Sequence, residues 1–315
     1  MKAIFYHRYG PSDVLEFGEV PEPKITDRQI LVKVHAASVN PVDWKFRSGK
    51  PRIPFLRMPR IPGLDIAGEV ARIGKAVTRF KIGDAVYGML SAFSGGGCAE
   101  YAAVPEENVA LKPRKLTFEE AAAVPVAGIT ALQALRNQGR IQDGHHVLIN
   151  GASGGVGSFA VQIAKACGAE VTAVASRRNM DFVKSLGANR MVDYTTEDFT
   201  QLDARYDIIF DAVVSRTFNE CKPVLSPRGV YITTLPTFAA ILHLLMGPLT
   251  RGKRARMINL RPRRADLETL TEWLEAGKVR PMIDKTFPLL KTAEAHALSE
   301  TGHARGKIVI RISEG

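Results

Sequence analysis

The fold is decided by the stretch Val147-Leu148-Ile149-Asn150-Gly151-Ala152-Ser153-Gly154-Gly155-Val156-Gly157. It begins as a short apolar run and then holds four glycines within seven residues. Beyond it, apolar residues recur three and four positions apart as far as Cys167, which is the spacing of a buried helix face. The stretch therefore predicts a strand, a glycine-rich turn and a helix, which is the setting that a dinucleotide-binding fingerprint requires.

The glycines fit a phosphate-binding turn in two registers. On Gly-x-Gly-x-x-Gly offsets the first position is Ala152, whereas a Gly-x-x-Gly-x-x-Gly pattern starts at Gly151. Glycine lets the backbone approach a pyrophosphate, and the N–H groups of the helix N-terminus bind that anion. We expect six residues to contact a dinucleotide: Ala152, Ser153, Gly154, Gly155, Val156 and Gly157. The alternative is a glycine-rich turn of an α/β domain without a cofactor.

The end of the next strand indicates which dinucleotide binds. This strand covers residues 170–175, and Ser176, Arg177 and Arg178 follow it without an acid. An acidic residue there would bond the ribose hydroxyls of NAD, whereas arginine suits a 2′-phosphate through charge-assisted hydrogen bonds. We therefore expect NADPH, bound by Ser176 and Arg177. The alternative is that both arginines are solvated charges at a helix start.

Composition limits the class of protein. The 315 residues are enough for about two domains, and 45% of them are hydrophobic. The net charge of +11 is dispersed, with no nucleic-acid-binding signature, so a basic chain that binds an anionic cofactor is the simpler explanation. Three distant cysteines fit a reduced, cytoplasmic setting. The first residues lack a signal-peptide core, and no apolar run reaches the ~18 residues of a spanning helix.

The hydrophobic pattern changes along the chain. Short strands and turns up to residue 102 predict a small β-barrel. Thr117 and Glu120 form a capping box, Asn40 is placed to cap a helical turn at Pro41, and another helix is expected from Thr130. From 147 on, strands alternate with helices, which predicts a parallel sheet. The strands are expected at 147–150, 170–175, 190–193, 207–210 and 229–233, the helices at 156–167, 179–186, 217–225 and 266–276, and the final strands at 285–290 and 307–312.

Several segments together resemble the medium-chain dehydrogenase/reductase superfamily, and within it the zinc-free quinone oxidoreductase branch. They occur in the family's order over nearly the whole chain: residues 38–45, 62–70, 83–88, 98–101 and 125–131, the glycine turn, and 303–307. The resemblance implies an α/β protein with a GroES-like, β-rich catalytic domain (1–122), a Rossmann domain with a doubly wound parallel sheet that binds NADP (123–265), and a C-terminal return to the catalytic domain (266–315). It also implies an active site in the cleft between the domains.

A metal site is not expected. The zinc-binding branch of the family has a cysteine within the segment that corresponds to 38–43 and a Gly-His-Glu where this chain reads Gly63-Leu64-Asp65. Here no cysteine precedes Cys98, and no histidine lies between His35 and His145. Catalytic zinc needs three protein ligands, which this region does not supply.

Further site residues follow from the resemblance alone. It implies that Asn40 and Thr130 hold the nicotinamide ribose and carboxamide, that Asp43 and Trp44 line the substrate pocket, and that Tyr194 and Lys307 reach the cofactor. Each has a structural alternative: a helix cap for Asn40, a helix start for Thr130, core for Trp44, a half-buried strand end for Tyr194 and a surface charge for Lys307. The catalytic candidates are Asn40, Asp43 and Thr130, and the proton donor is left open between Asp43, Tyr87 and solvent.

The resemblance implies an NADPH-dependent oxidoreductase that transfers hydride to a quinone or an α,β-unsaturated carbonyl without zinc. The alternative is a non-catalytic, structural or regulatory NADPH-binding protein. An apolar segment at 238–246, followed by seven basic residues up to Arg264, is interpreted as a pocket lid or subunit contact rather than a membrane surface. A homodimer is expected from the family.

Overall fold

The stretch 147–157 folds as its pattern predicts. The strand is β8 (His146–Asn150), the glycines form a turn, and the helix is α4 (Gly155–Ala166). The computed structural model describes residues 1–50, 52, 58–235, 241–242 and 252–313. They form two units, which we call unit 1 (residues 1–126, 262–276 and 281–315) and unit 2 (residues 127–261 and 277–280).

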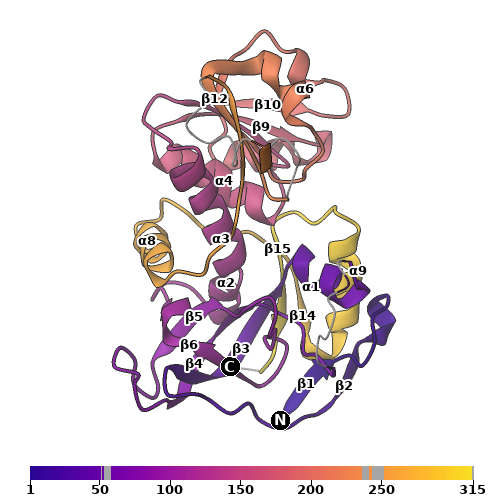
Figure 1. Ribbon diagram of the computed structural model, residues 1–315, viewed down its shortest axis with the longest axis vertical. Coiled ribbons are helices and arrows are strands. Elements are labelled where there is room, and N and C mark those ends of the chain that lie inside the picture. Colours follow the sequence, from indigo (N-terminus) through magenta and orange to yellow (C-terminus); the bar gives the residue numbers. More distant parts are fainter. Residues whose placement is uncertain (51, 53–57, 236–240, 243–251, 314–315) are drawn as a thin grey trace. The chain divides into compact units, whose positions relative to one another are not determined.

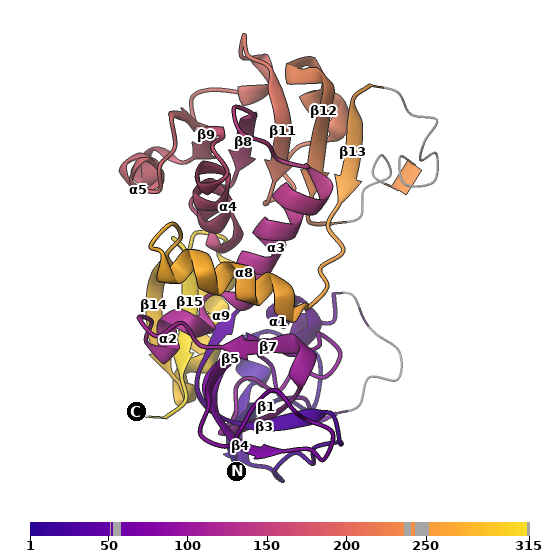
Figure 2. The ribbon, with the colours of Figure 1, turned by 90° about the vertical axis from the view of Figure 1, so that its left-hand side faces the viewer.

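Unit 2 is built on a six-stranded parallel sheet in the order β10-β9-β8-β11-β12-β13 (Figure 1). The strands besides β8 are β9 (Glu170–Ala175), β10 (Arg190–Asp193), β11 (Tyr206–Asp211), β12 (Leu225–Thr233) and β13 (Arg254–Met257). Helix α4 packs against β8 and β9, as Figure 2 shows. The strand order reverses between β8 and β11, so the carboxyl edge there is the ligand-binding edge of a doubly wound sheet.

Unit 1 is β-rich. Its main sheet runs β14-β15-β3-β4-β5-β7, with β6 also paired to β3, and β1 pairs with β2 in a separate ribbon. Strand β15 is antiparallel to β3, with Ile308 opposite Val39, so the last strand returns to the N-terminal part as predicted. The strands are β1 (Lys2–Phe5), β2 (Glu16–Glu19), β3 (Gln29–Val39), β4 (Asp65–Ile73), β5 (Ala85–Met89), β6 (Tyr101–Pro105), β7 (Val109–Leu111), β14 (Ile283–Pro288) and β15 (Lys307–Arg311).

Most predicted helices are present, with shifted ends. The helices of the described residues are α1 (Pro41–Ser48), α2 (Phe118–Ala122), α3 (Pro125–Leu132), α4, α5 (Met180–Ser185), α6 (Phe218–Cys221), α8 (Arg264–Glu275) and α9 (Thr292–Glu300), and α3 continues as a π-helix (Gln133–Gln138). The Thr117–Glu120 capping box is confirmed by bonds of 2.8 and 3.1 Å. The predicted helix start at Thr130 is wrong, because α3 already begins at Pro125.

Two elements were not predicted, and one prediction cannot be compared. Strand β13 and helix α9 are additional. In the helix predicted at 217–225, the α-helical part ends at Cys221 and a 3-10 turn (Lys222–Val224) continues it to the start of β12 at Leu225. Most of the apolar segment at 238–246 lies outside the described residues. No helix in the described part of the chain combines the length and apolar character needed to cross a bilayer.

Candidate active site

The glycine turn of unit 2 is tied to the sheet on its inner side. Gly151 has φ of +79°, and the backbone N–H groups of Gly151 and Ala152 donate to the Val174 carbonyl at 3.1 and 3.0 Å. A Cβ on Gly157 would lie 2.1 Å from the Gly151 carbonyl oxygen, so the helix can approach the turn only at glycine. Ala152 is fully buried and its N–H already donates to Val174, so its predicted contact with the dinucleotide stays a prediction without support from these bonds.

The outer side of the turn is open. A Cβ on Gly154 would come no closer than 3.5 Å to any neighbouring atom. The first intrahelical bond of α4 runs from the Ser158 N–H to the Gly154 carbonyl, so the N–H groups of Gly155 and Val156 have no acceptor within the helix. An uncrowded Gly154 beside N–H groups that lack an acceptor in the helix fits a phosphate, with the helix dipole favouring its charge. The residues present therefore fit a dinucleotide.

Ser176, Arg177 and Tyr194 lie together at the neighbouring strand end. Strands β9 and β10 pair Ala175 with Asp193, and the Tyr194 N–H donates to the Ala175 carbonyl at 3.2 Å. Tyr194 is 57% exposed, so the interpretation as a half-buried aromatic is wrong. The hydroxyl and N–H of Thr195 and the Arg177 backbone lower the pKa of Asp193. This carboxylate therefore supports the turn that carries Arg177.

The carboxylate of Asp65 accepts most of the hydrogen bonds in a buried polar cluster of unit 1. Its Oδ2 accepts from Ser38 Oγ at 2.6 Å, Asn40 Nδ2 at 2.8 Å and Lys307 Nζ at 3.1 Å, and its Oδ1 accepts from the Val126 N–H at 2.8 Å. Lys307 Nζ also donates to Asn40 Oδ1 at 2.6 Å. We call Ser38, Asn40, Asp65 and Lys307 the Asp65 cluster.

The Asp65 cluster arises because strand ends meet. Ser38 is paired with Asp65, the first residue of β4, and Val39 is paired with Ile308, next to Lys307. Lys307 is 3% exposed, so the surface alternative is wrong for this residue. Asp65 and Lys307 hold the amide of Asn40, and Asn40 also forms the capping box of α1 with Asp43, so the cap and the cluster contacts coexist. Asn40 and Lys307 were predicted as site residues, whereas Ser38 and Asp65 were not.

Asp43 lies beside this cluster. Its carboxylate accepts from the backbone N–H groups of Asn40 at 2.8 Å and Gly63 at 3.3 Å. Burial is the largest cause that raises the pKa of Asp43 to about 7; the charge of Asp65 acts in the same direction, and the two N–H bonds and Lys307 act against it. A carboxyl group with this pKa can exchange a proton near neutral pH.

The remaining candidates are resolved in part. The Tyr87 hydroxyl donates to the Leu267 carbonyl at 2.8 Å, and burial raises the pKa of Tyr87, so Tyr87 is a weaker proton donor than Asp43. Trp44 is half-buried, next to Asp43 in α1. Thr130 lies in unit 2, where it is 6% exposed within α3, and its pairing with Asn40 stays a prediction.

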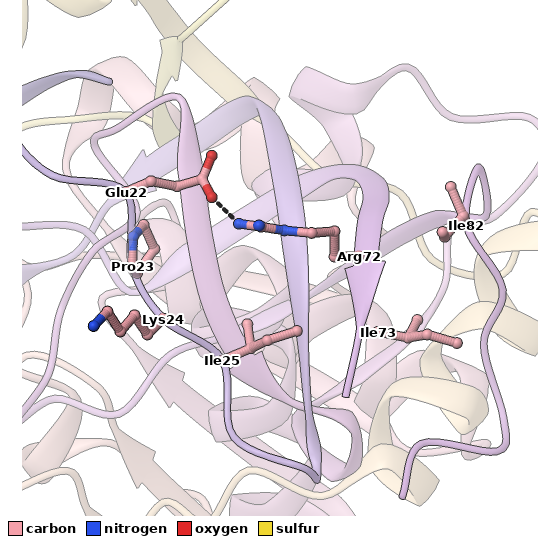
Figure 3. Close-up of a pocket in the computed structure, with 7 residues that line it drawn as sticks. All are labelled: Glu22, Pro23, Lys24, Ile25, Arg72, Ile73 and Ile82. Carbon is pink, nitrogen blue, oxygen red and sulfur yellow. Dashed lines mark ion pairs between the residues drawn. The ribbon is translucent and has the colours of Figure 1, made fainter. Parts of the chain in front are cut away.

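The hollows found in unit 1 are not lined by the Asp65 cluster, although Asp43 and Gly63 line a small one. Figure 3 shows one of about 550 Å³, where Glu22 and Arg72 form an ion pair beside Ile25, Ile73 and Ile82. None of its lining residues belongs to the candidate site, so we assign it no role. In the part of the chain that the structure describes, no three His, Cys, Asp or Glu side chains are grouped to hold a metal ion.

Two family models match the sequence. The alcohol dehydrogenase GroES-like domain matches residues 26–114, and a model described as zinc-binding dehydrogenase matches residues 186–310. The first match lies in the β-rich unit 1. The second begins within unit 2 and continues into the C-terminal part that returns to unit 1.

Relatives match over almost the full length. The chloroplast envelope quinone oxidoreductase homolog of Arabidopsis thaliana is 40% identical, with 98% of each chain covered. An NADPH-dependent alkenal/one oxidoreductase of the same plant is 36% identical, covering 98% of this chain and 79% of its own. The solved quinone oxidoreductase from Coxiella burnetii has a TM-score of 0.91 at 35% identity, with 99% of each chain covered. The chain therefore belongs to the quinone oxidoreductase family of the medium-chain dehydrogenase/reductase superfamily, with a GroES-like unit and a Rossmann unit.

Proposed function

We propose that this protein is an NADPH-dependent oxidoreductase that transfers a hydride to a quinone or an α,β-unsaturated carbonyl without zinc. The observation that carries the proposal is the carboxyl edge of the parallel sheet in unit 2. There the open side of Gly154 and two unpaired helix N–H groups lie at the end of β8, and Ser176 and Arg177 follow the next strand, β9. The first set suits a pyrophosphate and the second suits a 2′-phosphate.

The Asp65 cluster supports a role in orientation. The amide of Asn40 is held at both ends, because its oxygen accepts from Lys307 and its nitrogen donates to Asp65. An amide fixed in this way can bind one face of a ligand without rearranging, which is how catalytic groups contribute through proximity. When bound, the nicotinamide would supply the hydride. The chain would supply the orientation of Asn40 and a buried carboxyl group, Asp43, that can hold a proton.

The substrate class is inferred from the residue types expected at the site, which do not supply a set of zinc ligands. Saturated ketones need a strong Lewis acid or an oxyanion site, whereas conjugated acceptors take hydride at a position that needs less polarisation. Catalysis would then depend on orientation and on a few hydrogen bonds to the developing enolate or quinol oxygen. Two relatives support this class by name, as a quinone oxidoreductase homolog and an alkenal/one oxidoreductase.

The test is a substrate panel with the purified protein. NADPH and NADH are each mixed with 1,2-naphthoquinone, a benzoquinone and medium-chain enones, and loss of absorbance of the reduced nucleotide is followed. We expect turnover with at least one conjugated acceptor, faster with NADPH. Absence of turnover with every acceptor would refute the enzymatic proposal.

The alternative is a protein that binds NADPH without turnover. Against it stands the fixed amide of Asn40, since a protein that only stores a nucleotide has no need of an oriented polar group at a buried cluster. NADPH binding, measured by nucleotide fluorescence, together with no reaction across the panel would favour the alternative. The cytoplasmic location and the homodimer stay predictions.

A further inference from the structure

The side chain of Asn179 connects the two parts of the proposed nucleotide site. Its Nδ2 donates to Ser153 Oγ at 3.0 Å and to Ser176 Oγ at 3.4 Å. Ser153 lies in the glycine turn after β8, and Ser176 directly follows β9, the adjacent strand. The buried amide of Asn179, which is 7% exposed, therefore holds one hydroxyl from the glycine turn and one from the end of β9.

Asn179 occupies a helix N-cap position, where an asparagine side chain ordinarily bonds the helix backbone. It is the N-cap residue of α5, and asparagine is among the best N-caps because its side chain accepts from the helix N–H groups. Here its side chain makes no cap hydrogen bond. Its backbone N–H donates to the Ser176 carbonyl at 2.8 Å, which fixes the short turn Arg177–Asn179. The amide is thus directed toward the serines rather than toward its own helix.

The direction of these bonds decides what the hydroxyls can do. A serine hydroxyl has one hydrogen to donate and lone pairs that accept. Because Asn179 donates to both oxygens, each hydroxyl keeps its own hydrogen for another acceptor. Within the described residues neither hydroxyl donates to a protein group. Two free O–H donors beside the exposed Arg177 form a set that suits a phosphate.

We propose that Asn179 is a positioning residue for nucleotide selection. By accepting none of the serine hydrogens, it keeps the hydroxyls of Ser153 and Ser176 turned outward as donors, and it thereby sets the preference for NADPH over NADH. This inference rests on the proposed function, because it assigns the 2′-phosphate to the edge that β8 and β9 share. It adds a residue that does not touch the nucleotide in this scheme.

The test is Asn179→Asp, which has nearly the same size but can only accept. Both hydroxyls would then donate inward to the new carboxylate, and its negative charge would face the phosphate. Dissociation constants for NADPH and NADH are measured by nucleotide fluorescence, on wild type and variant. We expect NADPH to bind at least about 30-fold more weakly, since each lost charge-assisted bond is worth roughly tenfold or more. NADH should weaken clearly less, because it shares only the pyrophosphate beside Ser153 and its ribose carries no phosphate for Ser176 to bind.

Matched variants separate positioning from a general effect. Asn137→Asp adds the same charge at an exposed position of unit 2 and should leave both constants unchanged. In a protein that already carries Ser176→Ala, adding Asn179→Asp should reduce NADPH affinity less than it does in wild type. The reason is that one of the two hydroxyls that Asn179 positions is then absent. Far-UV circular dichroism confirms that each variant is folded.

The two dissociation constants of Asn179→Asp decide the proposal. A selective loss of NADPH affinity supports the proposal. Equal weakening of both nucleotides in a folded variant, or no change in either, overturns it, because Asn179 would then only support the turn. If wild type binds neither nucleotide, the proposed function itself fails, and that result is obtained before any variant is made.

Discussion

At the scale of single residues, the buried carboxyl group of Asp43 makes a prediction about stability and pH. In the unfolded chain this group ionises near pH 4, whereas in the fold its pKa is about 7. Between these values the native state holds about one proton more, so the contribution of Asp43 to stability is fully present below about pH 4 and is lost as the pH rises through 7. In wild type we expect Asp43 to lower the free energy of unfolding by about 1.4 kcal/mol per pH unit in this window.

Tryptophan fluorescence measures this effect in the relevant unit, because both tryptophans, Trp44 and Trp273, belong to unit 1. Urea unfolding is compared between wild type and Asp43→Asn at several pH values in the window. The free energy of unfolding of Asp43→Asn should not fall in this way as the pH rises, so the variant should become more stable relative to wild type. The exposed Asp203→Asn serves as the control and should keep the wild-type slope. A parallel pH dependence in wild type and Asp43→Asn would show that Asp43 does not titrate as described.

At the level of single residues, the sequence predicted some members of the candidate site and not others. Asn40, Asp43 and Lys307 were assigned through resemblance, and the structure brings them together, although their roles await experiment. Asp65 was overlooked as a site residue because a single acid at the start of a strand has no spacing pattern, and only the pairing of β3, β4 and β15 shows its partners. Asn179 was overlooked because a local N-cap explains an asparagine there equally well.

At the scale of elements, sequence patterns were most reliable where periodicity was strong. Strands β8, β9 and β10 and helix α4 match their predicted ranges within one residue. Strand β13 reads Arg-Ala-Arg-Met at the sheet edge, where only Ala255 is fully buried, so it shows little strand signal. Helix α9 buries Ala295 together with the polar residues Thr292 and His296, so its apolar stripe is short. Elements with few apolar residues were therefore missed, because burial of polar groups depends on partners distant in the sequence.

The glycine turn makes the second prediction, since its glycines differ in what they permit. In Gly157→Ala the new Cβ would lie 2.1 Å from the Gly151 carbonyl, a clash that backbone must absorb at roughly 1–3 kcal/mol. In Gly154→Ala the Cβ makes only an ordinary contact, 3.5 Å from the Gly151 carbonyl oxygen, at a φ of −78° that alanine adopts readily, so stability should be unchanged or slightly higher. Its NADPH affinity should nevertheless fall by about tenfold or more, because the Cβ occupies the phosphate approach.

Thermal unfolding by circular dichroism and NADPH titration distinguish the two variants. Gly157→Ala should melt several degrees below wild type, by about 2–4 °C for each kcal/mol lost. Gly154→Ala should melt at or above the wild-type temperature while binding the nucleotide weakly. If Gly154→Ala bound NADPH as wild type does, the open side of the turn would not be the phosphate site.

At the scale of the whole molecule, the order of elements predicted a β-rich start and an α/β middle, and the family resemblance supplied the GroES-like and Rossmann fold types. A β-rich start, an alternating middle and a final strand that rejoins β3 describe a GroES-like unit and a Rossmann unit, and both the topology and the family matches agree. The chain crosses between units again at residues 277–280, a short excursion that no sequence pattern marks. Such crossings depend on which unit offers packing partners, and local periodicity carries no information about that.

The last prediction concerns metal, because one matching family model is described as a zinc-binding dehydrogenase. Catalytic zinc needs three protein ligands held together. The described residues contain no such group, and the rest of the sequence adds one histidine, His243, and one carboxylate, Glu314, to the inventory. We therefore expect purified protein to carry well under one zinc per chain by elemental analysis. NADPH oxidation should be unchanged after dialysis against a chelator and after addition of zinc, with a zinc-dependent alcohol dehydrogenase treated in parallel to show that the chelator works. Stoichiometric zinc, together with activity that chelation abolishes and zinc restores, would refute the metal-independent mechanism and would require ligands from segments that are far apart in the sequence.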